Sequence, residues 1–165
     1  METDMPFSRW WYGQIIFWRS IWRMALHPED PGSRDRDYYG LTTFDQEGDV
    51  FLGLVCRTSR GELRISVLED DDDEKLRARA EVARSIAEMG DAFHEMWESW
   101  RNDQADMRQK NSEEIRALVV DKVTLYNYDD PAVGELYFKG KWPSDSWFCG
   151  YDHDQKRFYD LHQER

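Results

Sequence analysis

The sequence predicts an α+β domain in which an antiparallel β-sheet packs on one long helix. Three strand-like runs come first, helical spacing follows, and four strand-like runs end the chain, so the expected order is βββ-αα-ββββ. Strands and helices are grouped and do not alternate as βαβ units, which is typical of α+β domains. Aromatic residues make up 15% of the 165 residues, enough apolar material for one core.

The first three strands are expected at residues 39–44, 50–56 and 62–68. In the third run Leu63, Ile65 and Val67 alternate with polar residues, which places them on one face of a strand. Turn residues at 59–61 lie between the second and third runs, so these two strands are predicted to form a hairpin.

A long helix is expected from Asp73, because apolar residues recur at helical spacing as far as Trp100. Gly90 lies inside this pattern. Glycine is about 1 kcal/mol less favourable than alanine in a helix, so the helix can kink or divide there. Residues 111–114 are similar to a capping box and predict a short second helix through Leu118.

Four further strands follow, and the loop of a hairpin lies between the last two. The strands are expected at residues 119–126, 135–139, 147–151 and 157–161, and the loop at residues 152–156.

The chain divides into a Trp-rich leader, residues 1–28, and a single α+β domain, residues 29–165. Apolar residues surround any helix drawn through the leader, so we expect it to pack on the domain. Its uncharged stretch at residues 10–18 is far shorter than the roughly 20 residues of a membrane span. Glu2 and Asp4 lie where a signal peptide would be basic, so no secretion signal is expected.

The charge and the cysteines limit the class of protein. A formal net charge of -12 disfavours binding to nucleic acid or to an anionic membrane, since both would repel the chain. Cys56 and Cys149 each lie in an apolar run and are expected to be small buried thiols, which suits a reducing, cytoplasmic compartment.

No catalytic, cofactor or metal motif is recognisable, so we expect neither enzymatic activity nor a cofactor. The serines lack a Gly-x-Ser-x-Gly setting, and neither cysteine has an acid–base motif beside it. Asp152, His153 and Asp154, with His162 downstream, would be the residues of a metal-dependent enzyme. A polar hairpin tip is the favoured interpretation of this loop, since Asp side chains commonly cap turn amides.

The strongest functional signal is a run of six acids, residues 69–74, between the third strand and the long helix. Acids at a helix start also complement its dipole, but two or three would suffice for that role. We therefore interpret the run as a surface that faces a basic partner, with exposed aromatic residues as anchors. The predicted partner-binding residues are Glu69, Asp70, Asp71, Asp72, Asp73, Glu74, Trp142, Asp145, Trp147, Asp152 and Asp154.

Several segments occur in an order found in a known family: a Phe-x-Gly-x-Val run at 51–55, residues 61–67 leading into the acids, residues 112–115, residues 119–125 and an aromatic hairpin at 147–152. Over residues 38–161 the chain resembles a family of uncharacterised bacterial domains that are often encoded beside polymorphic toxins and regarded as immunity proteins. Members usually carry a His after the glycine of the last hairpin, where this chain has Tyr151. The resemblance implies inhibition by direct binding, with no catalytic residues to carry over.

The sequence therefore predicts an immunity-type protein that blocks the active-site cleft of a cognate toxin. The acid run and the tip at Asp152 and Asp154 would mimic an anionic substrate or meet basic cleft residues, and Trp142 and Trp147 would supply buried contact area. The alternatives are a structural or self-associating module that forms a homo-oligomer through the leader, and a small hydrolase or metal-dependent enzyme built around His153, His162 and Asp152.

Overall fold

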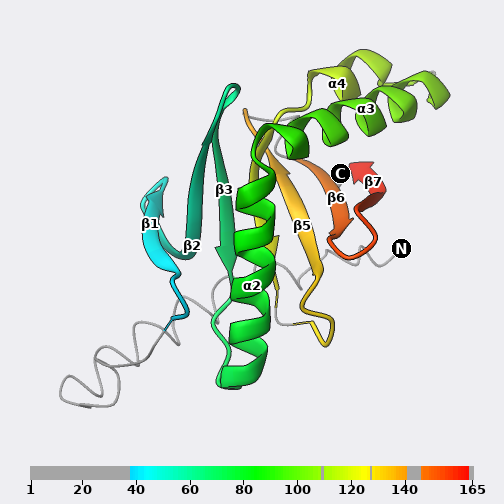
Figure 1. Ribbon diagram of the computed structural model, residues 1–165. Helices are drawn as coiled ribbons and strands as arrows, with labels where there is room; N and C mark the ends of the chain where they lie inside the picture. Colours follow the sequence, from blue (N-terminus) through cyan, green and yellow to red (C-terminus); the bar gives the residue numbers. More distant parts are fainter. Residues whose placement is uncertain (1–37, 109, 127, 141–145, 164–165) are drawn as a thin grey trace, which may run out of the picture. The chain divides into compact units, whose positions relative to one another are not determined.

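The computed structural model describes residues 38–108, 110–126, 128–140 and 146–163 (Figure 1). All of them belong to Tyr38–Arg165, one of two units into which the chain divides. The Trp-rich leader at residues 1–28, Trp142 and Asp145 lie outside the described residues. None of the described helices is long and apolar enough to cross a bilayer.

The described elements follow the chain as β1 (Thr42–Gln46), β2 (Asp49–Thr58), β3 (Gly61–Val67), α2 (Asp73–Met89), α3 (Asp91–Met107), α4 (Ser112–Ala117), β4 (Val120–Leu125), β5 (Val133–Phe138), β6 (Trp147–Asp152) and β7 (Arg157–Gln163). The predicted α+β class is confirmed, and the strands form one seven-stranded sheet in the order β1-β2-β3-β4-β5-β6-β7.

The sequence predicted an antiparallel sheet, but one pair of neighbouring strands is parallel. β3 and β4 are parallel, with Ile65 opposite Val123, whereas the other neighbouring strands are antiparallel. Parallel neighbours need a long crossover connection, and the helices α2, α3 and α4 provide it. The C-terminal ends of β3 and β4 therefore lie at the same end of the sheet.

The prediction of one long helix is wrong, because the helical pattern contains two separate helices. Gly90 lies between α2 and α3 with φ 52° and ψ -118°, which is not a helical conformation. Its carbonyl accepts the amide of Phe93 at 3.2 Å, so a new helix begins there. In Figure 1, α2 runs along the sheet and α3 leaves in a clearly different direction.

The predicted short helix is present as α4, but its expected cap is not. Asn111 has a left-handed backbone, with φ 65°, and its side chain makes no capping hydrogen bond. The sequence pattern thus identified the helix correctly and its N-terminal chemistry incorrectly.

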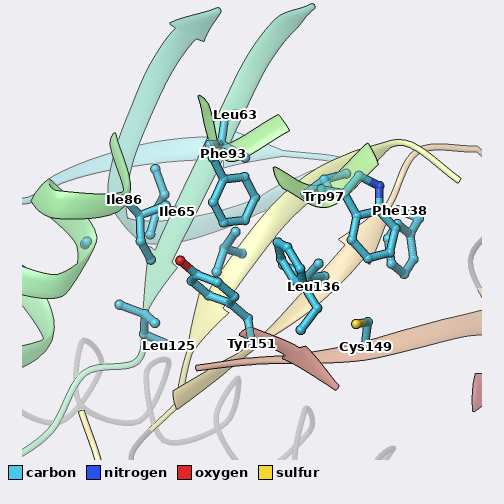
Figure 2. Close-up of a cluster of buried hydrophobic side chains, with 14 of the residues drawn as sticks. Leu63, Ile65, Ile86, Phe93, Trp97, Leu125, Leu136, Phe138, Cys149 and Tyr151 are labelled. Carbon is cyan, nitrogen blue, oxygen red and sulfur yellow. The ribbon is translucent and has the colours of Figure 1, made fainter. Parts of the chain in front are cut away.

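The core lies between the sheet and the helices α2 and α3 (Figure 2). The predicted inward face of β3 is confirmed, since Leu63 and Ile65 are fully buried. Tyr151 of β6 meets the ring of Phe93 edge to face, with centroids 5.2 Å apart. Full burial of such a side chain stabilises the fold by about 1.5–3 kcal/mol. Cys149 is buried here as predicted, and burial raises the pKa of its thiol to about 12.

The β1–β2 hairpin folds back over the face of the sheet that the helices leave uncovered. Residues 49–52 of β2 pair with β1 alone, and pairing with β3 begins at Gly53. A Cβ at Gly53 would lie 1.9 Å from the carbonyl oxygen of Ile65, so only glycine allows this close approach. Beyond it, Gln46 Nε2 donates to Asp121 Oδ2 at 2.5 Å, and Lys122 Nζ lies 3.8 Å from the Phe51 ring centroid.

Replacing Gly90 with alanine distinguishes a break from a kink. At the observed backbone angles alanine is strained, so Gly90→Ala should lower the free energy of unfolding by about 1–3 kcal/mol. In a continuous helix the same change would raise it by about 1 kcal/mol. Urea denaturation gives the sign, and an increase in stability would contradict the observed break.

Candidate partner-binding surface

The six acids of the run have different roles, and Asp72 is a helix cap. Its backbone is extended, and its Oδ1 accepts the amides of Glu74 at 3.0 Å and Lys75 at 3.3 Å. These amides have no partner within the helix, so the carboxylate satisfies them and complements the helix dipole. The structural role that the sequence left as an alternative therefore applies to this residue.

Asp70 is held by a buried arginine. The Arg79 side chain is fully buried, and its Nη2 donates to Asp70 Oδ2 at 2.7 Å while its Nη1 donates to the Tyr126 carbonyl at 3.3 Å. The hydrogen bond from Arg79, followed by one from the Asp72 amide, lowers the pKa of the Asp70 carboxyl below its ordinary value. Asp70 thus neutralises an internal cation and stabilises the fold.

Two further acids bind the segment that precedes β1. Glu69 accepts the hydroxyl of Tyr38 at 2.8 Å, and Asp73 accepts the hydroxyl of Tyr39. Asp71 and Glu74 are exposed, as are Asp72 and Asp73. Glu69 is exposed as well, so five carboxylates of the run face solvent even though Glu69, Asp72 and Asp73 also make structural contacts.

A shallow hollow of about 300 Å³ lies between the first turns of α2 and the β4–β5 connection. Asp72 and Glu74 contribute carboxylates from the acid run, and Asp129 contributes one from the other side. Tyr128 and Pro131 add an aromatic ring and an apolar wall. The hollow thus combines negative charge with apolar contact area, which suits a cationic side chain.

One cation lines the rim of this hollow. Lys75 Nζ lies 3.9 Å from Asp129 Oδ1, and both side chains are largely exposed, so this pair contributes little. Arg79 also lines the hollow, but its charge is already balanced by Asp70.

The strand register gathers three connections at this end of the sheet. The acid run follows β3, residues 126–132 follow the parallel strand β4, and the β6–β7 turn follows Asp152, which pairs with Val133 at the start of β5. We call this region the acidic end and define it by eight exposed carboxylates: Glu69, Asp71, Asp72, Asp73, Glu74, Asp129, Asp130 and Asp154.

Sequence reasoning missed the contribution of residues 128–131. Their acidic turn follows a strand, which is a visible signal, but only the parallel pairing of β3 with β4 brings it beside the acid run. That pairing depends on residues far apart in the chain, and no local pattern specifies it.

The remaining predicted residues divide between this end and the core. Asp154 is exposed at the acidic end, whereas Asp152 is 8% exposed and accepts the Gln155 amide at 3.0 Å. Trp147 begins β6, at the other end of that strand. It is 3% exposed, and its Nε1 donates to Glu114 Oε1 at 2.5 Å. Trp147 is therefore a core residue and not an exposed anchor.

His153 fastens the β6–β7 turn to α2. It is 5% exposed, its Nε2 lies 2.8 Å from Ser85 Oγ, and its Nδ1 lies 3.1 Å from the Tyr151 hydroxyl. Burial, followed by the nearby Lys156, lowers the pKa of His153, while Asp154 and Asp152 oppose this shift.

The contacts of His153 differ from those of the histidine in a serine–histidine catalytic site. The partner of Nδ1 is a tyrosine hydroxyl, where a serine–histidine site has a carboxylate. Among the described residues, no group of three or more His, Cys, Asp or Glu side chains lies together as metal ligands would.

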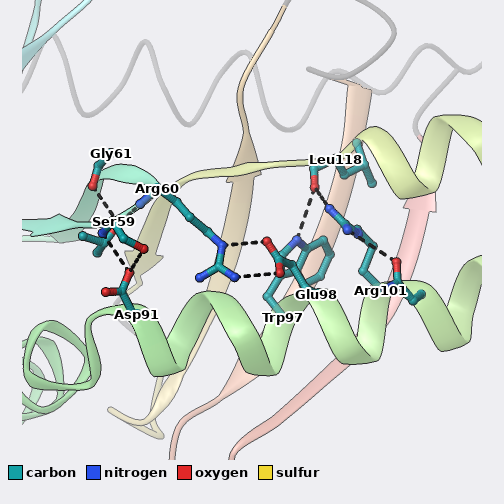
Figure 3. A network of polar contacts seen from close by, with 10 residues as sticks. Ser59, Arg60, Gly61, Asp91, Trp97, Glu98, Arg101 and Leu118 are labelled. Atoms are coloured by element: carbon teal, nitrogen blue, oxygen red, sulfur yellow. Dashed lines mark hydrogen bonds and ion pairs between the residues drawn. The ribbon is translucent and has the colours of Figure 1, made fainter.

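A second polar network lies at the β2–β3 turn and along α3 (Figure 3). Asp91 Oδ1 accepts the amide and the hydroxyl of Ser59, both at 2.8 Å. Arg60 forms a two-point ion pair with Glu98, at 2.9 and 3.0 Å. Because these groups bind one another, the network holds the turn on the helix.

Comparisons of this chain with protein-family models, with curated proteins and with solved structures found no match. Charge and geometry are therefore the basis for inferring a function.

Removing the Asp70 charge should destabilise the fold, because it leaves the buried Arg79 guanidinium uncompensated. We expect Asp70→Asn to lower the free energy of unfolding at pH 7 by about 3 kcal/mol, measured by urea denaturation. Glu74→Gln removes an exposed charge from the same run and should change stability by less than about 0.5 kcal/mol. Equal effects of the two changes would contradict the assigned roles.

Acid should weaken the contact between the β6–β7 turn and α2. The folded pKa of His153 lies below its ordinary 6.5, so the unfolded chain binds the proton more readily and stability falls as the pH drops below about 6.5. His94 is also buried with a lowered pKa and adds a loss of the same sign. His153→Gln should therefore reduce the loss of unfolding free energy between pH 7 and pH 5 without abolishing it. An unchanged loss in this variant would exclude the role of His153.

Proposed function

We propose that this protein is an immunity-type inhibitor that binds a toxin of basic surface through its acidic end and occludes the toxin's active site. The observation that carries this function is the convergence of three separate connections, which bring eight exposed carboxylates to one end of the sheet. Several of them, among them Asp72, Asp73 and Asp130, also make hydrogen bonds within the fold, yet all of them remain exposed.

The charge balance of the acidic end favours a cationic protein partner. The eight exposed carboxylates outnumber the exposed cations beside them, which are Lys75 and Arg77 on α2, Lys156 in the β6–β7 turn and Arg157 at the start of β7. The resulting negative potential would steer a basic surface toward this end and accelerate association. At 0.1 M salt such attraction is largely screened beyond roughly 10 Å, so the acceleration of association should be greatest at low ionic strength.

The hollow offers a contact that charge alone does not provide. A lysine or arginine side chain placed between Glu74 and Asp129 would meet carboxylates on both sides. The ring of Tyr128 and the side chain of Pro131 would cover its apolar stem. Contacts of this kind, enclosed by a polar rim, are where binding energy concentrates in protein interfaces.

The connections at the acidic end are held in place before any partner binds. Asp72 caps α2, Asp130 Oδ1 accepts the Ala132 amide at 2.9 Å, and Asp152 accepts the amide of Gln155. His153 additionally donates its backbone amide to the Ala132 carbonyl at 2.9 Å, which joins two of the connections. Preorganised loops lose little entropy on binding, so more of the contact energy remains as affinity.

Neutralising the hollow tests this function. The triple variant Asp72→Asn, Glu74→Gln, Asp129→Asn keeps the cap, since asparagine caps helices as well as aspartate does. We expect it to associate at least several-fold more slowly than the native protein at low salt with the cognate toxin, and to lose protection of cells that express that toxin. The difference in rate should shrink at high salt.

The matched control removes three exposed charges elsewhere, with Glu88→Gln, Glu95→Gln and Asp103→Asn on α2 and α3. It should associate nearly as fast as the native protein. If both triple variants slow association to the same extent, overall charge and not the acidic end determines binding. If neither slows association, the proposed function is refuted.

A further inference from the structure

β1 forms one edge of the sheet and offers backbone groups to another chain. Among the described residues it pairs with β2 alone, over Thr42–Gln46. Thr42, Thr43 and Asp45 are exposed, and no helix in the described part covers this edge. An edge strand with unpaired amides and carbonyls can accept a further strand.

The turn of the hairpin identifies which groups face outward. Glu47 and Gly48 both have positive φ, at 54° and 92°, which is the type I′ turn of a two-residue hairpin. The flanking pair, Gln46 with Asp49, is then the first hydrogen-bonded pair of the ladder. Bonded and non-bonded pairs alternate from there, so the backbone groups of Thr43 and Asp45 point away from β2.

The edge is held on a rigid support. Phe44 stacks on Phe51 with ring centroids 5.7 Å apart, and Phe51 in turn contacts the ammonium group of Lys122. Gln46 is anchored to Asp121 of β4. An incoming strand would therefore meet an ordered template and would not have to order β1 first.

The charges along the hairpin select the kind of strand that can bind. Asp45, Glu47 and Asp49 are all exposed. A second copy of this edge would bring like charges together, which disfavours self-pairing. An extended segment that carries lysine or arginine would place opposite charges across the new pairing.

The opposite edge of the sheet is less regular. In β7, Asp160 has φ 53° and the register with β6 shifts between Phe148 and Gly150. Such bulges twist an edge strand and interrupt continuous pairing.

We propose that the outer edge of β1 accepts an extended, lysine- or arginine-bearing segment of the partner as an eighth strand of this sheet. This inference rests on the proposed function and adds the mode of binding: the acidic end attracts the basic partner, and the backbone of β1 fixes its register. Backbone pairing supplies affinity, and the alternating side chains supply specificity.

A peptide pair tests this mode on the full chain. The probe is a short blocked peptide of alternating lysine and valine, and its match is the same peptide with every amide N-methylated, which keeps the charge but cannot donate to a strand. The unmethylated peptide should bind at least tenfold more tightly, and it should slow hydrogen exchange of the Thr43 and Asp45 amides. Equal affinities, no binding of either peptide, or protection outside β1 would overturn strand addition.

Two variants at one position complete the test. Thr43→Pro removes an outward amide and leaves the ladder to β2 intact, since proline is tolerated on edge strands where the amide faces solvent. The proline ring stands where the outward amide was and hinders a strand from pairing along β1, so the advantage of the unmethylated peptide should shrink, whereas Thr43→Val keeps the amide and should preserve that advantage. An undiminished advantage in Thr43→Pro would overturn the proposal. The peptide comparison and the exchange measurement on the native chain decide the question even if Thr43→Pro fails to fold.

The acidic-end triple variant separates this inference from the proposed function. If both peptides bind equally to the native chain and both weaken equally in that variant, strand addition fails while attraction of a basic partner stands. If the difference between the peptides persists and the triple variant has no effect on either affinity, the acidic end fails and the β1 edge stands.

Discussion

The acidic end depends on the hydrogen bonds that the buried guanidinium of Arg79 makes. It donates to Asp70, before α2, and to the carbonyl of Tyr126, after β4, so it joins two connections that are far apart in the sequence. A buried arginine without its carboxylate would be strongly destabilising, and this keeps the two connections together. Because β3 and β4 are parallel, the connections that follow them lie at the same end of the sheet, and Arg79 holds these two connections close together.

Much of the fold follows from local patterns, and what the sequence could not predict is long-range. Alternation in β3 and the start of α2 at Asp73 depend on neighbouring residues, so they were predictable. The break at Gly90 was recognisable only as a choice between a kink and a division, because tertiary packing decides which occurs. The fold-back of the β1–β2 hairpin depends on Gly53 meeting the backbone of β3, which no local pattern reports.

The candidate site shows the same limit in its side chains. The acid run was visible, but its division into structural and exposed members depends on which cation each carboxylate meets. Asp70 lies nine residues before Arg79, and only the helix and its burial bring them into contact. Trp147 was expected at the surface because alternation on a sheet cannot say which face is covered. Its indole instead binds Glu114 inside the fold.

Charge and backbone pairing would act at different stages of binding, and one molecule benefits from having both. Attraction by the acidic end would be long-ranged and tolerant of geometry, so it would raise the rate of encounter without selecting a register. Strand addition at β1 would be short-ranged and would demand a regular extended segment, so it would select among basic partners. The two surfaces belong to one sheet, and Lys122 connects them. Its ammonium group contacts the rings of Phe51 and Tyr137 and so holds the β1–β2 hairpin on the sheet that bears the acidic end. A basic protein that lacks an accessible extended segment would be attracted but not retained, and this difference would separate a cognate toxin from other cationic proteins.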